Sequence, residues 1–214
     1  MQVEIWSDIM CPFCYLGKRR FENALAQFDR DGEVDVVWKS FQLNPRLRAD
    51  VPMTTQEYLA REKGLDVAVV KQMNDRLARA GKLEGLDYRF DKVIVANTFD
   101  AHRLTHLARA HGKQHDMEGR LFRAHFSEGR NVADLPTLAE LGADVGLDRD
   151  AVSAALARDD FAEDVKRDVA EARELGVHGV PFFVFDRKYA VSGAQESGLF
   201  LEVLREAASA GAPS

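Results

Sequence analysis

The first residues of the chain alternate between apolar and polar side chains. Within residues 2–9, Val3 and Ile5 flank Glu4, and this period of two predicts a short strand. A second strand is predicted at residues 34–41, which are rich in β-branched and aromatic side chains. Between the two strands an amphipathic helix is predicted. Its apolar positions are Phe21, Leu25 and Phe28.

The middle of the chain has an almost wholly helical pattern. Between residues 53 and 176, apolar positions recur at helical spacing and runs of β-branched residues are few. Thr54 or Thr55 fits the cap of the first of these helices, and Asp134 fits the cap of a later one with Pro136 in its first turn. The predicted helices cover residues 54–63, 66–82, 96–111, 115–127, 135–145, 148–157 and 160–175.

The strand pattern returns near the end of the chain. Residues 181–185 and 189–193 predict an antiparallel pair joined by a turn at 186–188. A last helix follows, and residues 210–214 are expected to form a loose tail. The apolar stripe of that helix is Phe200, Val203, Leu204 and Ala207.

The order of these elements predicts an α/β protein with a thioredoxin-like fold and a large all-helical insertion. Removing the helical block leaves strand, helix, strand, then strand, strand, helix, which is the element order of that fold. We therefore expect a thioredoxin-like domain formed by residues 1–51 and 165–214, and an inserted helical domain at residues 52–164.

Composition is typical of a folded globular chain. The 214 residues are 46% apolar and 30% charged, and the formal net charge is −6. This acidic balance, without a basic arm, argues against a nucleic-acid partner. The apolar runs fall far short of the ~20 residues that span a bilayer, and the N-terminus lacks the basic region of a signal peptide. We therefore expect no membrane association and a cytoplasmic location.

The two cysteines of the chain, Cys11 and Cys14, are separated by Pro12 and Phe13. One pair closing so small a loop adds little stability as a structural disulfide, and a second Cys-x-x-Cys for a zinc site is missing. A redox-active pair remains, at the point where the first strand ends and the first helix begins.

Position at a helix N-terminus suits this chemistry. Unpaired N–H groups and the partial positive charge of the helix favour the thiolate of Cys11. We therefore expect Cys11 to be an exposed nucleophile and Cys14, a turn further in, to be the buried resolving thiol. Pro12 fits the first turn because its missing N–H is not needed there. Two inert cysteines that happen to be close are the alternative.

Three segments carry a specific combination of residues. They are residues 11–17 (Cys-Pro-Phe-Cys-Tyr-Leu-Gly), 176–183 (Gly-Val-His-Gly-Val-Pro-Phe-Phe) and 192–195 (Ser-Gly-Ala-Gln). Together they resemble the DsbA-like thioredoxin superfamily, and within it the FrnE-like branch of cytosolic proteins. The resemblance covers nearly the whole chain and implies a protein-disulfide oxidoreductase. The superfamily also includes glutathione-dependent 2-hydroxychromene-2-carboxylate isomerases, which typically carry Ser at the position of Cys11.

The resemblance also implies roles for residues around the cysteines. Pro181 is expected to be cis and to face the pair, with the backbone of Val180 offered to an extended substrate. Phe13 stands where DsbA has a histidine, and it lacks a hydrogen-bond donor. We therefore expect a weaker oxidant than DsbA.

Other polar residues are candidates for contacts with substrate or glutathione. These are Asn97, His102, Arg103, His178 and Gln195. Caps, packing and solvated loops are the alternative roles for them. His102 and His106 are four residues apart on one helix, but no further ligand accompanies them and no metal is expected. Lys18, Arg19 and Arg20 are expected to form a solvated helix face.

The sequence therefore favours a thiol–disulfide oxidoreductase acting through a mixed disulfide at Cys11, with Cys14 as the resolving thiol. No cofactor is required, although glutathione is a possible one. Expected partners are protein or peptide thiols and disulfides, and glutathione, with the chain as a monomer or homodimer. Two alternatives stay open: a glutathione-dependent isomerase or transferase acting on a small aromatic metabolite, and a non-enzymatic redox-sensing chaperone or binding module.

Overall fold

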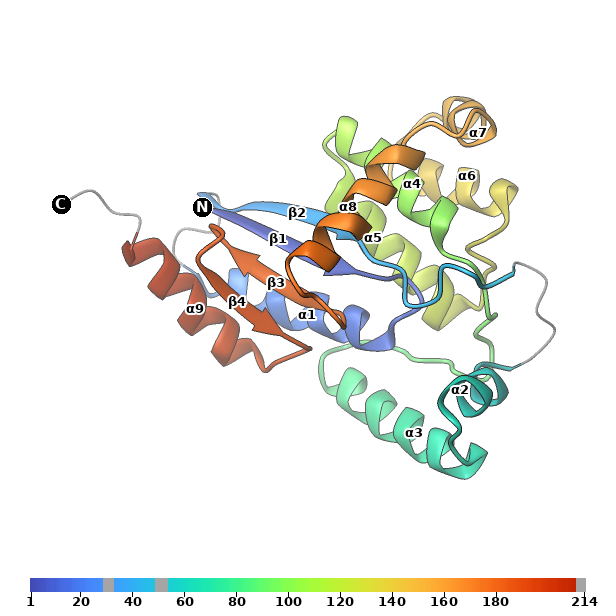
Figure 1. The fold of residues 1–214 in the computed structure, drawn as a ribbon, viewed down its shortest axis with the longest axis horizontal. Coiled ribbons are helices and arrows are strands. Elements are labelled where there is room, and N and C mark those ends of the chain that lie inside the picture. The colour runs from blue at the N-terminus through green and yellow to red at the C-terminus, as the bar shows by residue number, and fades with distance from the viewer. Residues whose placement is uncertain (29–32, 49–53, 211–214) are drawn as a thin grey trace.

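The computed structural model of the chain describes residues 1–28, 33–48 and 54–210. They form a mixed sheet with helices on both faces, and a further group of helices at one end (Figure 1). The predicted tail at 210–214 lies, from residue 211 on, outside the described residues.

A four-stranded sheet holds the fold together, and its strand order is β2-β1-β3-β4. β1 lies inside the sheet, parallel to β2 and antiparallel to β3, and β4 is antiparallel to β3. The strands are β1 (Gln2–Ser7), β2 (Asp35–Ser40), β3 (Phe182–Phe185) and β4 (Tyr189–Ser192). The first strand is therefore paired with segments from both ends of the chain, as the element order predicts.

Helices from both ends of the chain cover the sheet. α1 (Pro12–Leu25) and α9 (Ser197–Ala210) pack on one face, where Phe21 and Phe200 contact Phe183 of β3 with ring centroids 5.5 and 4.5 Å apart. On the opposite face Trp6 packs with Ala172 of α8 (Ala162–Glu174). The alternation that predicts β1 thus divides its side chains between two cores.

The remaining helices lie between β2 and α8 in the sequence. They are α2 (Thr55–Lys63), α3 (Val67–Leu83), α4 (Phe99–Ala110), α5 (Gln114–Arg123), α6 (Leu135–Asp144) and α7 (Arg149–Ala157). Thr54 and Asp134 cap α2 and α6 as predicted. The single helix expected at 115–127 instead ends as α5 and continues as a π-helical turn, η2 (Ala124–Glu128).

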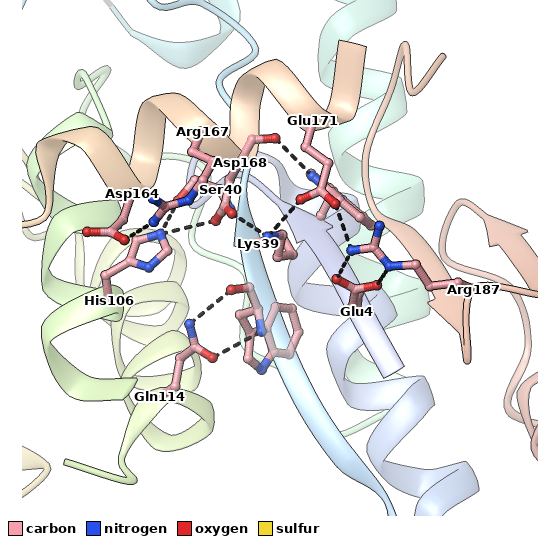
Figure 2. A network of polar contacts seen from close by, with 12 residues as sticks. Glu4, Lys39, Ser40, His106, Gln114, Asp164, Arg167, Asp168, Glu171 and Arg187 are labelled. Carbon is pink, nitrogen blue, oxygen red and sulfur yellow. Dashed lines mark hydrogen bonds and ion pairs between the residues drawn. The ribbon is translucent and has the colours of Figure 1, made fainter. Parts of the chain in front are cut away.

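A buried polar cluster fastens α8 to the edge of the sheet (Figure 2). The Asp168 carboxylate accepts a hydrogen bond from the backbone N–H of Ser40 at 2.9 Å, lies 3.1 Å from Nε2 of His106, and pairs with Lys39. Burial raises the pKa of Asp168, but these partners lower it by more and leave it below its usual range. The carboxylate therefore stays charged because α4 and β2 surround it with donors.

The same cluster extends to the turn between β3 and β4 (Figure 2). Arg187 donates two hydrogen bonds to Glu4 of β1, at 2.7 and 2.6 Å, and one to Glu171 of α8 at 2.7 Å. Lys39 also contacts Glu171, at 2.9 Å. Charged side chains thus connect β1, β2 and the β3–β4 turn to α8.

Candidate active site

The cysteine pair lies on the turn that joins β1 to α1. Cys11 is the N-cap of α1, and its backbone N–H donates to the carbonyl of Asp8 at 2.9 Å. The N–H of Cys14 donates to the carbonyl of Cys11 at 3.0 Å, and Pro12 fills the first helical turn. Both cysteines are free thiols. The sulfur of Cys11 therefore lies at the end of the helix where N–H groups concentrate.

The loop before β3 faces this turn. The Val180–Pro181 peptide bond is cis, as the resemblance implies. Sγ of Cys11 lies 3.5 Å from the carbonyl oxygen of Val180, to which the thiol donates. Gly17 of α1 lets the two segments approach closely, because a Cβ there would stand 2.9 Å from Cγ of Pro181. Residues far apart in the sequence are thus brought together around one sulfur.

Cys11 differs from the prediction in its exposure. Its residue surface is 4% exposed, whereas the sequence predicted an exposed nucleophile. Val180 packs against the same apolar cluster as Cys11 and covers it from the cis-proline loop. The expected order still holds, since Cys14 is 0% exposed. Phe13, between them, is 48% exposed and places an apolar ring at the surface beside the pair.

Cys14 is buried in an environment that disfavours its thiolate. Burial raises the pKa of the Cys14 thiol well above its usual value, and the neighbouring Cys11 raises it further. The backbone of Asp8 and the hydroxyl of Ser7 act in the opposite direction but more weakly. Cys14 is therefore protonated at neutral pH, as suits a thiol that acts only after its partner has reacted.

Asp8 holds the cysteine turn in place from behind. Its carboxylate accepts hydrogen bonds from the Thr98 hydroxyl and the Leu43 backbone N–H, both at 2.7 Å, and it is fully buried. His102 lies 3.5 Å from the same carboxylate. Burial lowers the pKa of His102, but contact with Asp8 raises it by more, so the imidazole pKa is above its usual value.

A second buried acid, Glu118, lies close to this group and was not predicted. The side chain is 1% exposed, and burial raises the pKa of its carboxyl. The Ser7 hydroxyl lowers the pKa of both Glu118 and Cys14, and it has no partner in hydrogen-bonding geometry. No local pattern reveals this arrangement, because Glu118 belongs to α5, far along the chain from the cysteines.

Lys18 is another correction to the predictions. The expected solvated face holds for Arg19, whose side chain is 42% exposed, but Lys18 is 5% exposed and the Arg20 side chain is 12% exposed, paired with Glu84 and Glu196. Its ammonium group pairs with Glu22 and lies 3.0 Å from Nε2 of His115. Burial raises the pKa of Glu22, yet His115 and Lys18 together lower it to about 2. α5 packs over this face of α1 and excludes the solvent.

Aromatic rings form the wall on the other side of the cysteine turn. The hydroxyl of Tyr88 donates to the carbonyl of Pro12 at 2.6 Å. Tyr15 packs against Tyr88 and against Phe122, with ring centroids 5.5 and 5.3 Å apart. Burial raises the pKa of Tyr88, so the phenol remains a donor. Tyr88, in the segment between α3 and α4, thus fixes the backbone of the motif at Pro12.

Two of the predicted contact residues are enclosed by the protein. His102 and Arg103 are each 2% exposed. Arg103 donates to the carbonyls of Asp160, Ala155 and Leu156 at 2.9–3.1 Å and so satisfies the end of α7. Asn97 accepts from the N–H of Phe99 at 2.9 Å and donates to the carbonyl of Leu47 at 2.7 Å. Direct contact with substrate is thus not available to His102 or Arg103, and Asn97 has the alternative role, that of a cap.

The other two predicted contact residues lie on exposed loops. His178 precedes the cis-proline by three residues. Gln195 lies two residues after Gly193, whose N–H donates to the carbonyl of Pro181 at 2.8 Å. His106 binds Asp168 rather than a metal. Within the described residues, no three His, Cys, Asp or Glu side chains are grouped as metal ligands.

Residues 2–205 match the family of DSBA-like thioredoxin domains. The chain belongs to this family. The crystal structure of a probable DsbA oxidoreductase from Streptomyces coelicolor is 41% identical in sequence and superimposes with a TM-score of 0.94 over 100% of this chain and 92% of that one. Family membership therefore agrees with the resemblance seen in the sequence.

More distant relatives share the fold. The cytosolic disulfide reductase DsbM from Pseudomonas aeruginosa is 19% identical, with a TM-score of 0.69 over 99% of this chain and all of that one. A solved 2-hydroxychromene-2-carboxylate isomerase is 20% identical, with a TM-score of 0.70 over the same shares. Within residues 1–28, 33–48 and 54–210, none of the helices is long and apolar enough to cross a bilayer.

Proposed function

We propose that the protein is a thiol–disulfide oxidoreductase that uses Cys11 and Cys14. The observation that carries the proposal is the position of the Cys11 sulfur, at the N-cap of α1 and 3.5 Å from the Val180 carbonyl on the facing loop. A helix N-terminus stabilises a thiolate, and an extended loop beside it offers backbone groups to a substrate. Membership of the DSBA-like family supports the same chemistry.

The reaction needs two exchanges. The Cys11 thiolate attacks a substrate disulfide, so that a Cys11–substrate bond forms and the other substrate sulfur leaves as a thiolate that takes a proton. Cys14 then loses its proton and attacks the Cys11 sulfur, which releases the second substrate thiol. Two electrons pass from the cysteine pair to the substrate, and the Cys11–Cys14 disulfide remains. Run in reverse, the same steps oxidise a dithiol.

Burial of Cys14 gives the two thiols different roles. With no exposed surface and a raised pKa, Cys14 is a poor nucleophile toward outside disulfides. It becomes reactive once Cys11 carries a disulfide beside it. Cys11 is the sulfur that meets substrate, and Cys14 is the one that ends the mixed disulfide.

We place the reaction in the cytoplasm, with protein or peptide thiols and disulfides as substrates and glutathione as the reductant that restores the dithiol. No bound cofactor takes part in either exchange. Support comes from the fold shared with a cytosolic disulfide reductase, which has also been solved with glutathione at 19% identity and a TM-score of 0.62. Direction depends on the potential of the pair relative to the glutathione pool.

A trapping experiment tests the proposal. The reduced Cys14→Ser variant should accumulate a mixed disulfide between Cys11 and insulin. The adduct is seen as a mass increase that dithiothreitol removes. The Cys11→Ser variant is the matched control and should trap nothing, because its remaining thiol is buried. Wild-type protein should reduce insulin with glutathione, and both variants should lose this turnover.

Other outcomes contradict the proposal. Retained insulin reduction by Cys11→Ser would mean that the pair does not do the chemistry. Turnover absent from the wild type, with glutathione adducts as the sole trapped species, would favour a glutathione-dependent isomerase or transferase. Substrate holding that survives Cys11→Ser would favour a chaperone or binding module.

A further inference from the structure

An apolar cavity opens directly beside the cysteine turn. Its volume is about 300 Å³, at the lower end of the range for small-ligand sites. Met10 and Pro12, the two chain neighbours of Cys11, both line it. A group held in this cavity therefore contacts the residues on either side of the cysteine that reacts.

Aromatic side chains form much of the wall. Phe90, Phe126 and Tyr58 line the cavity, and Phe90 and Phe126 meet edge to face with ring centroids 6.2 Å apart. Aliphatic side chains from residues 93–96 complete the apolar surface. Rings arranged in this way favour an aromatic occupant, because offset and edge-to-face contacts add to the burial of its surface.

Two polar atoms inside the wall have no partner. Nδ2 of Asn74 and Nδ1 of His125 are buried without a hydrogen bond, in side chains that line the cavity and whose residues are 6% and 2% exposed. Leaving such groups buried and unpaired is unfavourable, because they lose their bonds to water without gaining others. They come from different elements, α3 and η2, and a ligand hydroxyl can accept from one and donate to or accept from the other.

The charge of the cavity restricts its ligand further. Among the described residues that line it, Glu62 alone carries a charge. His125 is neutral at pH 7 because burial lowers its pKa to about 4. An anionic group would be desolvated here without a cation to pair with, which disfavours glutathione with its carboxylates. A neutral occupant fits.

We propose that this cavity is a specificity pocket for a neutral aromatic group carrying a hydroxyl, borne by the disulfide that Cys11 attacks. The inference rests on the proposed function and adds to it the class of substrate. The hydroxyl satisfies Asn74 and His125, and the ring contacts Phe90 and Phe126. A tyrosine next to a cysteine in a peptide and a free phenolic thiol present the same chemistry.

Single-turnover reduction of matched disulfides by the pre-reduced full-length protein tests this. The peptide pair consists of the symmetric disulfides of N-acetyl-Cys-Tyr-amide and N-acetyl-Cys-Ala-amide. The small-molecule pair consists of the symmetric disulfides of 4-(2-mercaptoethyl)phenol and butanethiol. Each reaction converts one disulfide to two thiols and closes Cys11–Cys14. We expect the phenolic member of at least one pair to react on the order of tenfold faster, the range for one well-fitted apolar group. The pair that shows it identifies the source.

Variants locate the effect. Leu59→Trp fills part of the cavity with an indole ring, and it should reduce the rate ratio of the phenolic to the control disulfide toward one. Leu201→Trp, another half-buried leucine, packs at α9 against the sheet and should leave the preference unchanged. Asn74→Leu removes an unpaired donor at similar volume and should abolish the preference for tyrosine over phenylalanine in the same peptide. It serves as the test if Leu59→Trp does not fold, as judged by circular dichroism.

Two results separate failure of this inference from failure of the proposed function. Hydroxyethyl disulfide has no ring to occupy the cavity and provides the reference rate. If the wild type reduces it yet shows no phenolic preference in either pair, or if Leu59→Trp folds and keeps the preference, the pocket assignment is wrong. If the wild type reduces none of these disulfides, the oxidoreductase function itself is wrong.

Discussion

His125 should make the protein less stable as the pH falls below 6.5. The imidazole is 2% exposed in η2, and burial lowers its pKa to about 4 from an ordinary value of 6.5. Above pH 6.5 the side chain is neutral in the folded and unfolded states, so it contributes no pH dependence. Between pH 6.5 and about 4 the unfolded chain binds a proton that the folded chain excludes, and the free energy of unfolding decreases.

The size of the effect follows from the shift. Each unit between the two pKa values is worth ~1.36 kcal/mol. A pH of 4.5 is two units below the pKa of His125 in the unfolded chain, so the expected loss in the free energy of unfolding is ~2–3 kcal/mol relative to pH 7.5. This is a large part of the ~5–15 kcal/mol that stabilises a typical domain.

His125→Leu isolates this contribution. Unfolding by urea, followed by tryptophan fluorescence at pH 7.5 and 4.5 with a phosphine reductant, gives the free energy of unfolding of both proteins. We expect the stability of the variant relative to the wild type to increase by ~2–3 kcal/mol between pH 7.5 and pH 4.5. Glu22, Glu118 and His102 titrate in both proteins, so their contributions cancel in the difference.

An equal difference at both pH values would refute the reasoning that burial excludes the proton. A matched control is His178→Leu, which removes an exposed imidazole that solvent surrounds in both states. The same gain in that variant would show that the effect does not depend on burial at η2.

Two further substitutions test the parts that hold the site together. Asp168→Ala should lower the free energy of unfolding by ~3–5 kcal/mol, because it leaves buried cations without their carboxylate. The control Asp164→Ala, on the same helix but in a surface ion pair, should lower it by ~0–1 kcal/mol. Urea unfolding of both variants measures the difference. A smaller loss for Asp168→Ala than for its control would contradict the role of the cluster. Gly17→Ala should lower the free energy of unfolding by ~1–3 kcal/mol and slow thiol–disulfide exchange, because the new Cβ meets the ring of Pro181. The control Gly198→Ala has no atom within 4 Å of the new Cβ and should leave stability unchanged or raise it. Unchanged stability and exchange rate in Gly17→Ala would show that the Pro181 loop shifts without consequence.

Much of the fold was accessible from local patterns. The alternation at Val3 and Ile5, the helical spacing of Phe21 and its neighbours, and the caps at Thr54 and Asp134 each act within a few residues, so one sequence reveals them. The cysteine turn was predicted for the same reason. A strand, a Cys-Pro-x-Cys motif and a helix are adjacent in the chain.

The surroundings of the site depend on contacts that no local pattern records. The Thr98 hydroxyl that binds Asp8 lies 90 positions away in sequence, and the carbonyl facing Cys11 lies 169 positions away. The burial of Cys11 and Lys18, and the position of Glu118 beside Ser7, depend on how α5 and the Pro181 loop pack. Arg103 was predicted as a candidate for contact with substrate or glutathione because sequence alone does not show which helix covers it.

The order of the strands in the sequence has a consequence during synthesis. β1 and the cysteine turn leave the ribosome first, but β3 and the loop that covers the Cys11 sulfur come 169 residues later. At ~5–20 residues per second, the nascent chain carries both thiols without that cover for roughly ten to thirty seconds. During this time one edge of β1 has no native partner, and the pair is open to glutathione and to oxidants. These cysteines are therefore most easily oxidised or joined to glutathione in newly made chains rather than in mature ones.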